Sequence, residues 1–214
     1  MTAVTLVGSG LMARAIATRV LAGGGAVQVL GESTADAERL AAELGEPGRV
    51  TAGAVGDEVT GDVVVLAVPY AVEVELAAAL AAALDGKVVV DITNPVDQAT
   101  YSGLVTPPGT SAAEQVQAAA PGARVVKAFN TTFPGPLREG HVAGQALDVF
   151  LAGDDPAARA AVARLVRSGG MRPVDVGGLS RARGLEWLGL LHVTMQFTRG
   201  TTFGSAIKVV DPAG

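Results

Sequence analysis

The chain begins with an apolar stretch that leads directly into a glycine turn and then into a helical pattern. Residues 4–13 read Val-Thr-Leu-Val-Gly-Ser-Gly-Leu-Met-Ala. Gly8, Gly10 and Ala13 fit the spacing G-x-G-x-x-G/A. In this fingerprint the first glycine permits the tight exit from a strand, the second permits close backbone approach, and the small third residue lets the helix lie near the sheet. Strand, turn and helix in this order predict the first βα unit of a dinucleotide-binding domain.

The same turn predicts an anion site. The helix expected over residues 11–21 starts with N–H groups that lack partners within the helix, and the positive end of its dipole also favours an anion. Gly8 and Gly10 would therefore lie against the pyrophosphate of a dinucleotide. The alternative interpretation is a glycine-rich turn that binds nothing.

A carboxylate ends the second expected strand. Glu32 follows Gly8 by some two dozen positions, where an acid accepts hydrogen bonds from the adenosine ribose hydroxyls. A 2′-phosphate would meet like charge there, and residues 31–34 contain no base, although Arg14 is near enough in sequence to reach a phosphate. Glu32 thus favours NAD(H). The alternative is a solvated loop residue ahead of a helix capped by Ser33 or Thr34.

Strand and helix patterns alternate along the rest of the chain. We expect strands over residues 3–7, 26–30, 49–52, 62–68, 87–92, 124–127, 148–152 and 172–176, and helices over 11–21, 34–44, 72–84, 112–119, 156–167 and 181–198. This alternation predicts an α/β fold with a doubly wound, mostly parallel Rossmann-type sheet and a small C-terminal helical extension. We expect a dinucleotide-binding domain over 1–140 and a C-terminal part over 141–214, joined in one compact unit.

The last expected helix carries an apolar stripe. Leu185, Leu188, Leu191 and Met195 fall on one side of residues 181–198. Such a stripe packs into the core of its own chain more often than against a partner, so core packing is the favoured prediction.

Three further loops follow expected strands, at residues 66–70, 91–96 and 127–132. Ligands of open parallel sheets bind outside the carboxyl ends of the strands. Asn94 and Asn130 bring amides to this edge, and Pro69 and Pro95 stiffen their turns. Each loop alone is consistent with ordinary turn chemistry. Three such loops at one edge, together with the fingerprint, favour a binding site.

Composition excludes several classes of function. Among 214 residues there is no cysteine, the two histidines are far apart, and the formal net charge is −5. These features argue against disulfides, a metal site, and nucleic acid or anionic membranes as general partners. The chain starts directly with a strand pattern, and no apolar run is long enough to span a bilayer. We therefore expect a cytoplasmic protein without a secretion signal or a membrane segment.

Three later segments carry a family resemblance. They read Val-Val-Lys-Ala-Phe-Asn-Thr-Thr (125–132), Asp-Val-Phe-Leu-Ala-Gly-Asp-Asp-Pro-Ala-Ala (148–158) and Arg-Pro-Val-Asp-Val-Gly-Gly-Leu-Ser-Arg-Ala-Arg-Gly-Leu-Glu (172–186). In this order they resemble NADP oxidoreductases that depend on the deazaflavin coenzyme F420, over nearly the whole chain. The resemblance extends to the cytoplasmic reductase domain of membrane metalloreductases that pass electrons from NADPH through flavin to haem.

The resemblance implies hydride transfer between nicotinamide C4 and a deazaflavin or flavin ring, catalysed by positioning of the two rings. It also implies a homodimer and a C-terminal part that completes the second cofactor pocket, towards residues 179–183 and 201–207. No catalytic side chain is expected. By match of motif, the cofactor-binding residues are Gly8, Ser9, Gly10, Leu11, Met12, Glu32, Ser33, Ala67, Val68, Pro69, Asn94, Pro95, Ala128 and Asn130.

The chain departs from the family after its second strand. Family members commonly carry Gly-Ser-Arg there, and the serine and arginine grip the 2′-phosphate of NADP. This chain reads Gly31-Glu32-Ser33, which removes the arginine and adds an acid. The cofactor expectation is therefore NADP or NAD, with Glu32 favouring NAD. Arg181 and Arg183 are candidate partners for the acidic tail of F420.

Two other functions stay open from the residues. The first is a nicotinamide-dependent reductase of a small imine or ketone, whose proton donor would come from Tyr70, Tyr101, His141 or His192. The second is a non-catalytic dinucleotide-binding module. Such modules often end near residue 140, whereas this chain continues with a further βα unit and a long helix.

Overall fold

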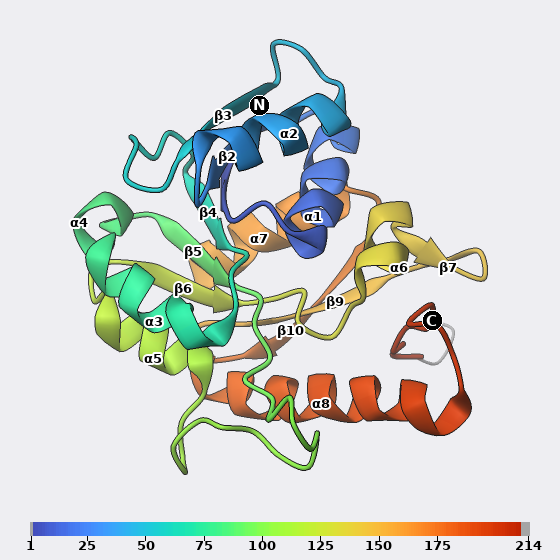
Figure 1. Ribbon diagram of the computed structural model, residues 1–214. Helices are drawn as coiled ribbons and strands as arrows, with labels where there is room; N and C mark the ends of the chain where they lie inside the picture. The colour runs from blue at the N-terminus through green and yellow to red at the C-terminus, as the bar shows by residue number, and fades with distance from the viewer. Residues whose placement is uncertain (1, 211–214) are drawn as a thin grey trace.

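The computed structural model describes residues 2–210 and places eight strands in one sheet, in the order β10-β9-β6-β5-β4-β1-β2-β3 (Figure 1). The strands are β1 (Ala3–Val7), β2 (Ala26–Gly31), β3 (Val50–Ala54), β4 (Val63–Leu66), β5 (Val88–Asp91), β6 (Arg124–Lys127), β9 (Asp148–Ala152) and β10 (Arg172–Gly177). A separate two-stranded hairpin consists of β7 (His141–Val142) and β8 (Gln145–Ala146).

Helices connect the strands and end the chain. They are α1 (Leu11–Ala22), α2 (Thr34–Leu44), α3 (Tyr70–Ala79), α4 (Ala81–Leu84), α5 (Ala112–Ala119), α6 (Pro134–Glu139), α7 (Pro156–Ser168) and α8 (Ala182–Arg199), with a 3₁₀ turn η1 (Leu179–Arg181) before α8. One apolar core joins the sheet to α1, α2 and α7, and another joins its opposite face to α3 and α5. In Figure 1, α8 lies along the lower edge of the view.

The strand directions confirm the predicted doubly wound, mostly parallel α/β fold. β1 pairs in parallel with both β2 and β4, so the chain reverses its winding direction across β1. Parallel pairing continues from β4 through β5 to β6. The strands β9 and β10 are parallel to each other, but β9 meets β6 antiparallel, through Lys127 and Ala152. The carboxyl ends of β1, β4 and β5 therefore meet at one edge of the sheet, where ligands bind in such folds.

One expected helix differs from the structure, and a further helix and a hairpin were not expected. The helix expected over 72–84 is interrupted at Leu80, which ends α3 and precedes α4. Helix α6 and the β7–β8 hairpin are additional elements in a stretch that the sequence left unassigned. Pro134 occupies the first turn of α6, where its missing N–H costs no helical hydrogen bond.

The predicted core packing of the α8 stripe holds for Leu185 and Leu188, which pack in a cluster with Phe150, but is wrong for the second half of the helix. Leu185 is buried, but Leu191 is 56% exposed and Met195 is 38% exposed. The inner side of α8 instead buries polar groups, including Glu186, His192 and Gln196. That side faces hydrogen-bonding loops at the edge of the sheet, so polar side chains with partners occupy it. Within residues 2–210, no helix is long and apolar enough to cross a membrane.

Candidate functional site

The first glycine of the fingerprint is fixed by its surroundings. Gly8 has φ +116°, and a Cβ atom there would lie 2.4 Å from the carbonyl oxygen of Ala67. Its N–H donates to the carbonyl of Leu30 at 2.8 Å. The turn after β1 is thus wedged between the ends of β2 and β4, and only glycine fits its backbone conformation and its space.

The second glycine leaves the start of α1 open. Gly10 is the N-cap of α1, makes no side-chain capping hydrogen bond, and a Cβ atom there would meet nothing within 4 Å. The first turn of α1 carries no acidic residue. Ala13 is fully buried in the core shared with the sheet, as the fingerprint predicts. The free N–H groups and the helix dipole make this terminus suited to an anion.

A hollow of about 790 Å³ lies next to this terminus, at the carboxyl ends of β1, β4 and β5. Its volume falls in the usual range for small-molecule and cofactor sites, about 300–1,000 Å³. The predicted residues that line it are Gly10, Leu11, Met12, Ala67, Val68, Pro69, Asn94 and Pro95. The structure therefore brings together predicted residues from three separate loops.

The two predicted asparagines bind each other. Asn94 donates from Nδ2 to the carbonyl of Asn130 at 2.6 Å, and Asn130 donates from Nδ2 to Asn94 Oδ1 at 2.8 Å. Asn130 Nδ2 also lies 2.8 Å from the carbonyl of Leu185 in α8. Asn94 lines the hollow, whereas Asn130 and Ala128 are buried behind it. These hydrogen bonds join the two loops to each other and, through Asn130, to α8. The predicted contact of the two amides with a nicotinamide stays a prediction.

The corner after β2 is acidic. Glu32 is exposed, and Ser33 is the N-cap of α2, where its Oγ accepts from the N–H of Asp36 at 3.2 Å. Hydrogen bonds from Ser33 and Arg39 lower the pKa of Asp36, so a second carboxylate is charged in the first turn of α2. Glu32 and Ser33 lie outside the hollow of about 790 Å³, and their predicted contact with the adenosine ribose is untested.

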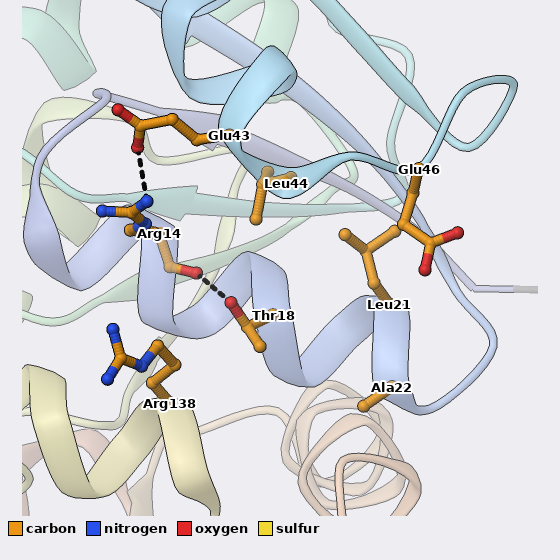
Figure 2. A pocket seen from close by; sticks show the side chains of 8 residues that line it. All are labelled: Arg14, Thr18, Leu21, Ala22, Glu43, Leu44, Glu46 and Arg138. Carbon is orange, nitrogen blue, oxygen red and sulfur yellow. Dashed lines mark hydrogen bonds and ion pairs between the residues drawn. The ribbon is translucent and has the colours of Figure 1, made fainter.

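Arg14 points away from that corner. Its guanidinium lies 2.8 Å from Glu43, near the C-terminal end of α2 (Figure 2). Both residues line a second hollow of about 380 Å³ between α1, α2 and α6, with Arg138 on its far side. Glu43 follows the start of α2 by nine positions, which corresponds to about 14 Å along the helix. In this arrangement Arg14 does not take the place of the arginine that the resemblance leads one to expect after β2.

The C-terminal residues assigned to a second cofactor are only partly accessible. Arg183 holds Glu114 through Nε at 2.8 Å and Nη2 at 2.6 Å, and Leu179 is buried, whereas Arg181 is exposed. The tail is tied to α8 because Ser205 Oγ lies 2.9 Å from His192 Nε2. Burial lowers the pKa of His192, so its imidazole is neutral at pH 7.

Of the four proton-donor candidates, Tyr70 lines the hollow. Its hydroxyl donates to Gln115 Oε1 at 3.2 Å. Tyr101 packs edge-on against Phe197, and His192 is buried against Phe133. Thr93 belongs to the 91–96 loop expected at the site but was not named as a binding residue, and Val105 was not expected to line the hollow. The signal was available, because both belong to the long Pro- and Thr-rich segment after β5 that folds back over the hollow.

Comparisons with known proteins agree with one another. Residues 3–95 match the family described as NADP oxidoreductase, coenzyme F420-dependent. The F420-dependent NADP reductase of Methanocaldococcus jannaschii is 33% identical over 132 residues, which cover 59% of this chain and 58% of that protein. Metalloreductase STEAP3 of Rattus norvegicus is 30% identical over 183 residues, 86% of this chain and 35% of that protein.

A solved structure matches almost end to end. It is a protein of Arthrobacter sp. FB24 with a provisional assignment as an F420-dependent NADP reductase, at 29% identity and a TM-score of 0.85. The match covers 97% of this chain and 99% of that chain. These matches span about a third of the rat protein and somewhat over half of the archaeal one.

Proposed function

We propose that the chain, whose residues 3–95 match the family of coenzyme F420-dependent NADP oxidoreductases, is a member of that family and transfers a hydride between a nicotinamide dinucleotide and a deazaflavin. The observation that carries the proposal is the junction of the open α1 N-terminus with the hollow of about 790 Å³. An anion-binding terminus beside a hollow of cofactor size, at the edge where three parallel strands end, suits an extended dinucleotide.

The residues present fit such a cofactor. Gly10 leaves space for close approach, and the first-turn N–H groups of α1 would bind the pyrophosphate. The backbone of residues 67–69 would flank the path from ribose to nicotinamide, and Asn94 would present a rigid wall because Asn130 holds its amide. When bound, the nicotinamide would supply the hydride chemistry. The role of the chain is then to hold two rings in register.

For the nicotinamide cofactor we propose NADP(H), which is the cofactor named for the family. We propose that the affinity for NADP(H) exceeds the affinity for NAD(H) by only a small factor. Glu32 and the charged Asp36 both lie at the start of α2, where the 2′-phosphate would be placed. Two carboxylates oppose that phosphate, which supports substantial use of NAD(H). The preference for NAD expected from Glu32 has no support from the family description or from the archaeal relative, both of which name NADP.

For the hydride partner we propose coenzyme F420, with a flavin as the second choice. The C-terminal part, residues 141–214, would complete its site next to residues 1–140. Arg181 is the accessible cation for the acidic tail, because Arg183 is bound to Glu114. A reductase of a small imine or ketone is the alternative function, and Tyr70 at the hollow is the observation that favours it.

We also propose a homodimer, which the family resemblance implies. The outer side of α8 exposes Trp187, Leu191 and Met195 at a spacing of four residues. Large apolar side chains gathered on one exposed helix face are typical of an interaction surface. A second copy of the chain would cover them.

A titration of the purified full chain tests the function. NADPH and NADH are titrated first, and then F420, FMN, FAD and a small cyclic imine are offered while oxidation of the nicotinamide is followed by its absorbance. Turnover with F420 or a flavin supports the proposal. Turnover with the imine alone replaces it with the reductase alternative, and binding without any turnover identifies a dinucleotide-binding module.

A further inference from the structure

A buried cluster of charged side chains lies directly beneath the loop that lines the hollow. Lys127 at the end of β6 is fully buried and lies 2.9 Å from Asp91 at the end of β5 and 2.9 Å from Glu186 of α8. Lys127 Nζ also donates to the carbonyl of Thr93 at 2.6 Å. Glu73 of α3 completes the cluster through the Thr93 hydroxyl. One ammonium group therefore faces three buried carboxyl groups.

The cluster connects the hollow to α8. Thr93 follows β5 and lines the hollow, and its N–H donates to Asp91 Oδ1 at 2.6 Å while Lys127 holds its carbonyl. Glu186 Oε1 accepts from Lys127 and from the N–H of Ala112, the first residue of α5. Both backbone groups of Thr93 are thus bound to buried charges, which are bound in turn to α5 and α8.

Hydrogen-bond counting locates a proton. Thr93 Oγ1 lies 2.8 Å from Asp91 Oδ1 and 3.0 Å from Glu73 Oε2, but a hydroxyl has one hydrogen to donate. Both contacts are hydrogen bonds only when one carboxyl group is protonated. Asp91 accepts from the Thr93 N–H and from Lys127, which favours its ionised form, whereas Glu73 Oε1 is buried without a partner. The proton therefore belongs on Glu73.

The electrostatics agree with that count. Burial raises the pKa of Glu73 well above its ordinary value, the negative charge of Asp91 adds to the effect, and Lys127 only partly opposes it. Burial disfavours the ammonium of Lys127, but its charged neighbours, Asp91 first and then Glu186, oppose burial and the pKa of Lys127 is raised. Burial likewise raises the pKa of Glu186, which the charge of Lys127 partly offsets. A neutral Glu73 reduces the excess of negative charge around one lysine.

We propose that Lys127, Asp91 and Glu186 are positioning residues, which hold the Thr93–Asn94 loop and α8 in a fixed relative position. We also propose that Glu73 is protonated in the folded protein and that the cluster needs this proton. The cofactor side of the inference rests on the proposed function, while the proton and the loop order can be measured without any ligand. Asp91 and Glu73 are bound to the same hydroxyl, but amide replacement of Asp91 should then disturb the loop far more than amide replacement of Glu73.

The ligand-free test compares Glu73→Gln with wild type and with Glu75→Gln, an exposed glutamate of the same helix. When folding raises the pKa of a carboxyl group, the folded protein loses stability as the pH rises above the pKa of that group in the unfolded chain, which is 4.5 for glutamate. The folding constant of wild type, relative to Glu73→Gln, should fall about tenfold per pH unit above that value. The infrared C=O band of a buried protonated carboxyl should vanish in Glu73→Gln and persist in Glu75→Gln.

The positioning test uses Asp91→Asn. Hydrogen exchange at the Thr93 amide should speed up far more in Asp91→Asn than in Glu73→Gln, and the affinity for NADPH should fall at least about tenfold further. If Asp91→Asn does not fold, Asp91→Glu, which keeps the charge but displaces the carboxylate from the Thr93 N–H, takes its place in both assays. Three results would overturn the inference. They are equal effects of Asp91→Asn and Glu73→Gln on hydrogen exchange and NADPH affinity, the same pH dependence of stability in wild type and Glu73→Gln, or the absence of the infrared C=O band from wild type. If wild type does not bind NADPH but the pH and infrared measurements do show the proton on Glu73, only the proposed function is refuted.

Discussion

Gly189 of α8 lies so close to Asn94 that a Cβ atom at position 189 would stand 2.3 Å from Asn94 Oδ1. The helix and the loop that lines the hollow are therefore in direct contact at Gly189. Gly189→Ala should therefore displace Asn94 and weaken its hydrogen bonds with Asn130. We expect the KM for the nicotinamide cofactor to rise about tenfold, since small misplacements of positioning groups are costly. Gly184→Ala is the matched control, because a Cβ atom there meets nothing within 4 Å. Equal KM values for the two variants would remove Asn94 from the site.

The two turn glycines should separate folding from binding. Gly8→Ala puts a side chain at φ +116° and against the Ala67 carbonyl, so we expect a loss of about 3 kcal/mol or more in unfolding free energy. A Cβ atom at Gly10 meets open space, so Gly10→Ala should keep the melting temperature and lose dinucleotide affinity. Calorimetry and fluorescence titration measure the two effects. Unaltered affinity in Gly10→Ala would argue against pyrophosphate at the start of α1.

Cofactor preference should turn on position 32. Glu32→Arg replaces like charge with a partner for the 2′-phosphate, so the ratio of kcat/KM for NADPH over NADH should increase at least about tenfold. The exposed Glu38, further along α2, provides the control Glu38→Arg with the same change in net charge. A wild-type protein that already prefers NADPH by a wide margin would show that Glu32 does not oppose the phosphate.

Asp148 should make the C-terminal tail sensitive to acid. Burial alone would raise its pKa, but hydrogen bonds from Arg172, Lys208 and the Val209 N–H outweigh burial and lower it to about 2. A carboxyl group whose pKa falls on folding stabilises the protein above its unfolded pKa of 3.8, and this stability is lost as pH falls towards 2. Asp148→Asn should thus lower the unfolding free energy at pH 7, and its difference from wild type should shrink below pH 4. A difference that stays constant with pH in denaturant titrations would contradict this.

The exposed face of α8 makes a prediction about assembly. Leu191→Glu places a charge between Trp187 and Met195, and it should convert a dimer into a monomer by light scattering. Thr194→Glu, on the same helix but outside the apolar row, adds the same charge as a control. A wild-type protein that is monomeric at high concentration would exclude the proposed dimer.

Local patterns predicted the fold well where each element carries its own signal. The expected bounds of β1, α2, α5, β6 and β9 match the structure, because apolar periodicity, caps such as Ser33 and Ser111, and terminating glycines act within a few residues. Helix α6 escaped notice because Pro134, Gly135 and Pro136 look like a turn. Its stability comes from packing against α1, which no local pattern reveals.

The loops that line the hollow could be predicted from the sequence, but the buried charged cluster beneath them could not. The glycine turn and the loops that contain Pro69 and Asn94 lie at strand ends, so topology alone gathers them. Glu186 is distant in sequence, and its burial against Lys127 depends on how α8 crosses the sheet. A signal for the buried pair did exist, since two adjacent parallel strands end on opposite charges, Asp91 and Lys127, which face each other in register.

Trp187 is the only tryptophan of the chain, and it is half exposed on the helix that Gly189 presses against the pocket loop. Its emission is therefore an intrinsic probe placed by the fold itself. Reduced nicotinamide bound nearby would quench it, whereas a partner that covers α8 would shift it to shorter wavelength. One spectroscopic signal, recorded without any label, would distinguish ligand entry from subunit association.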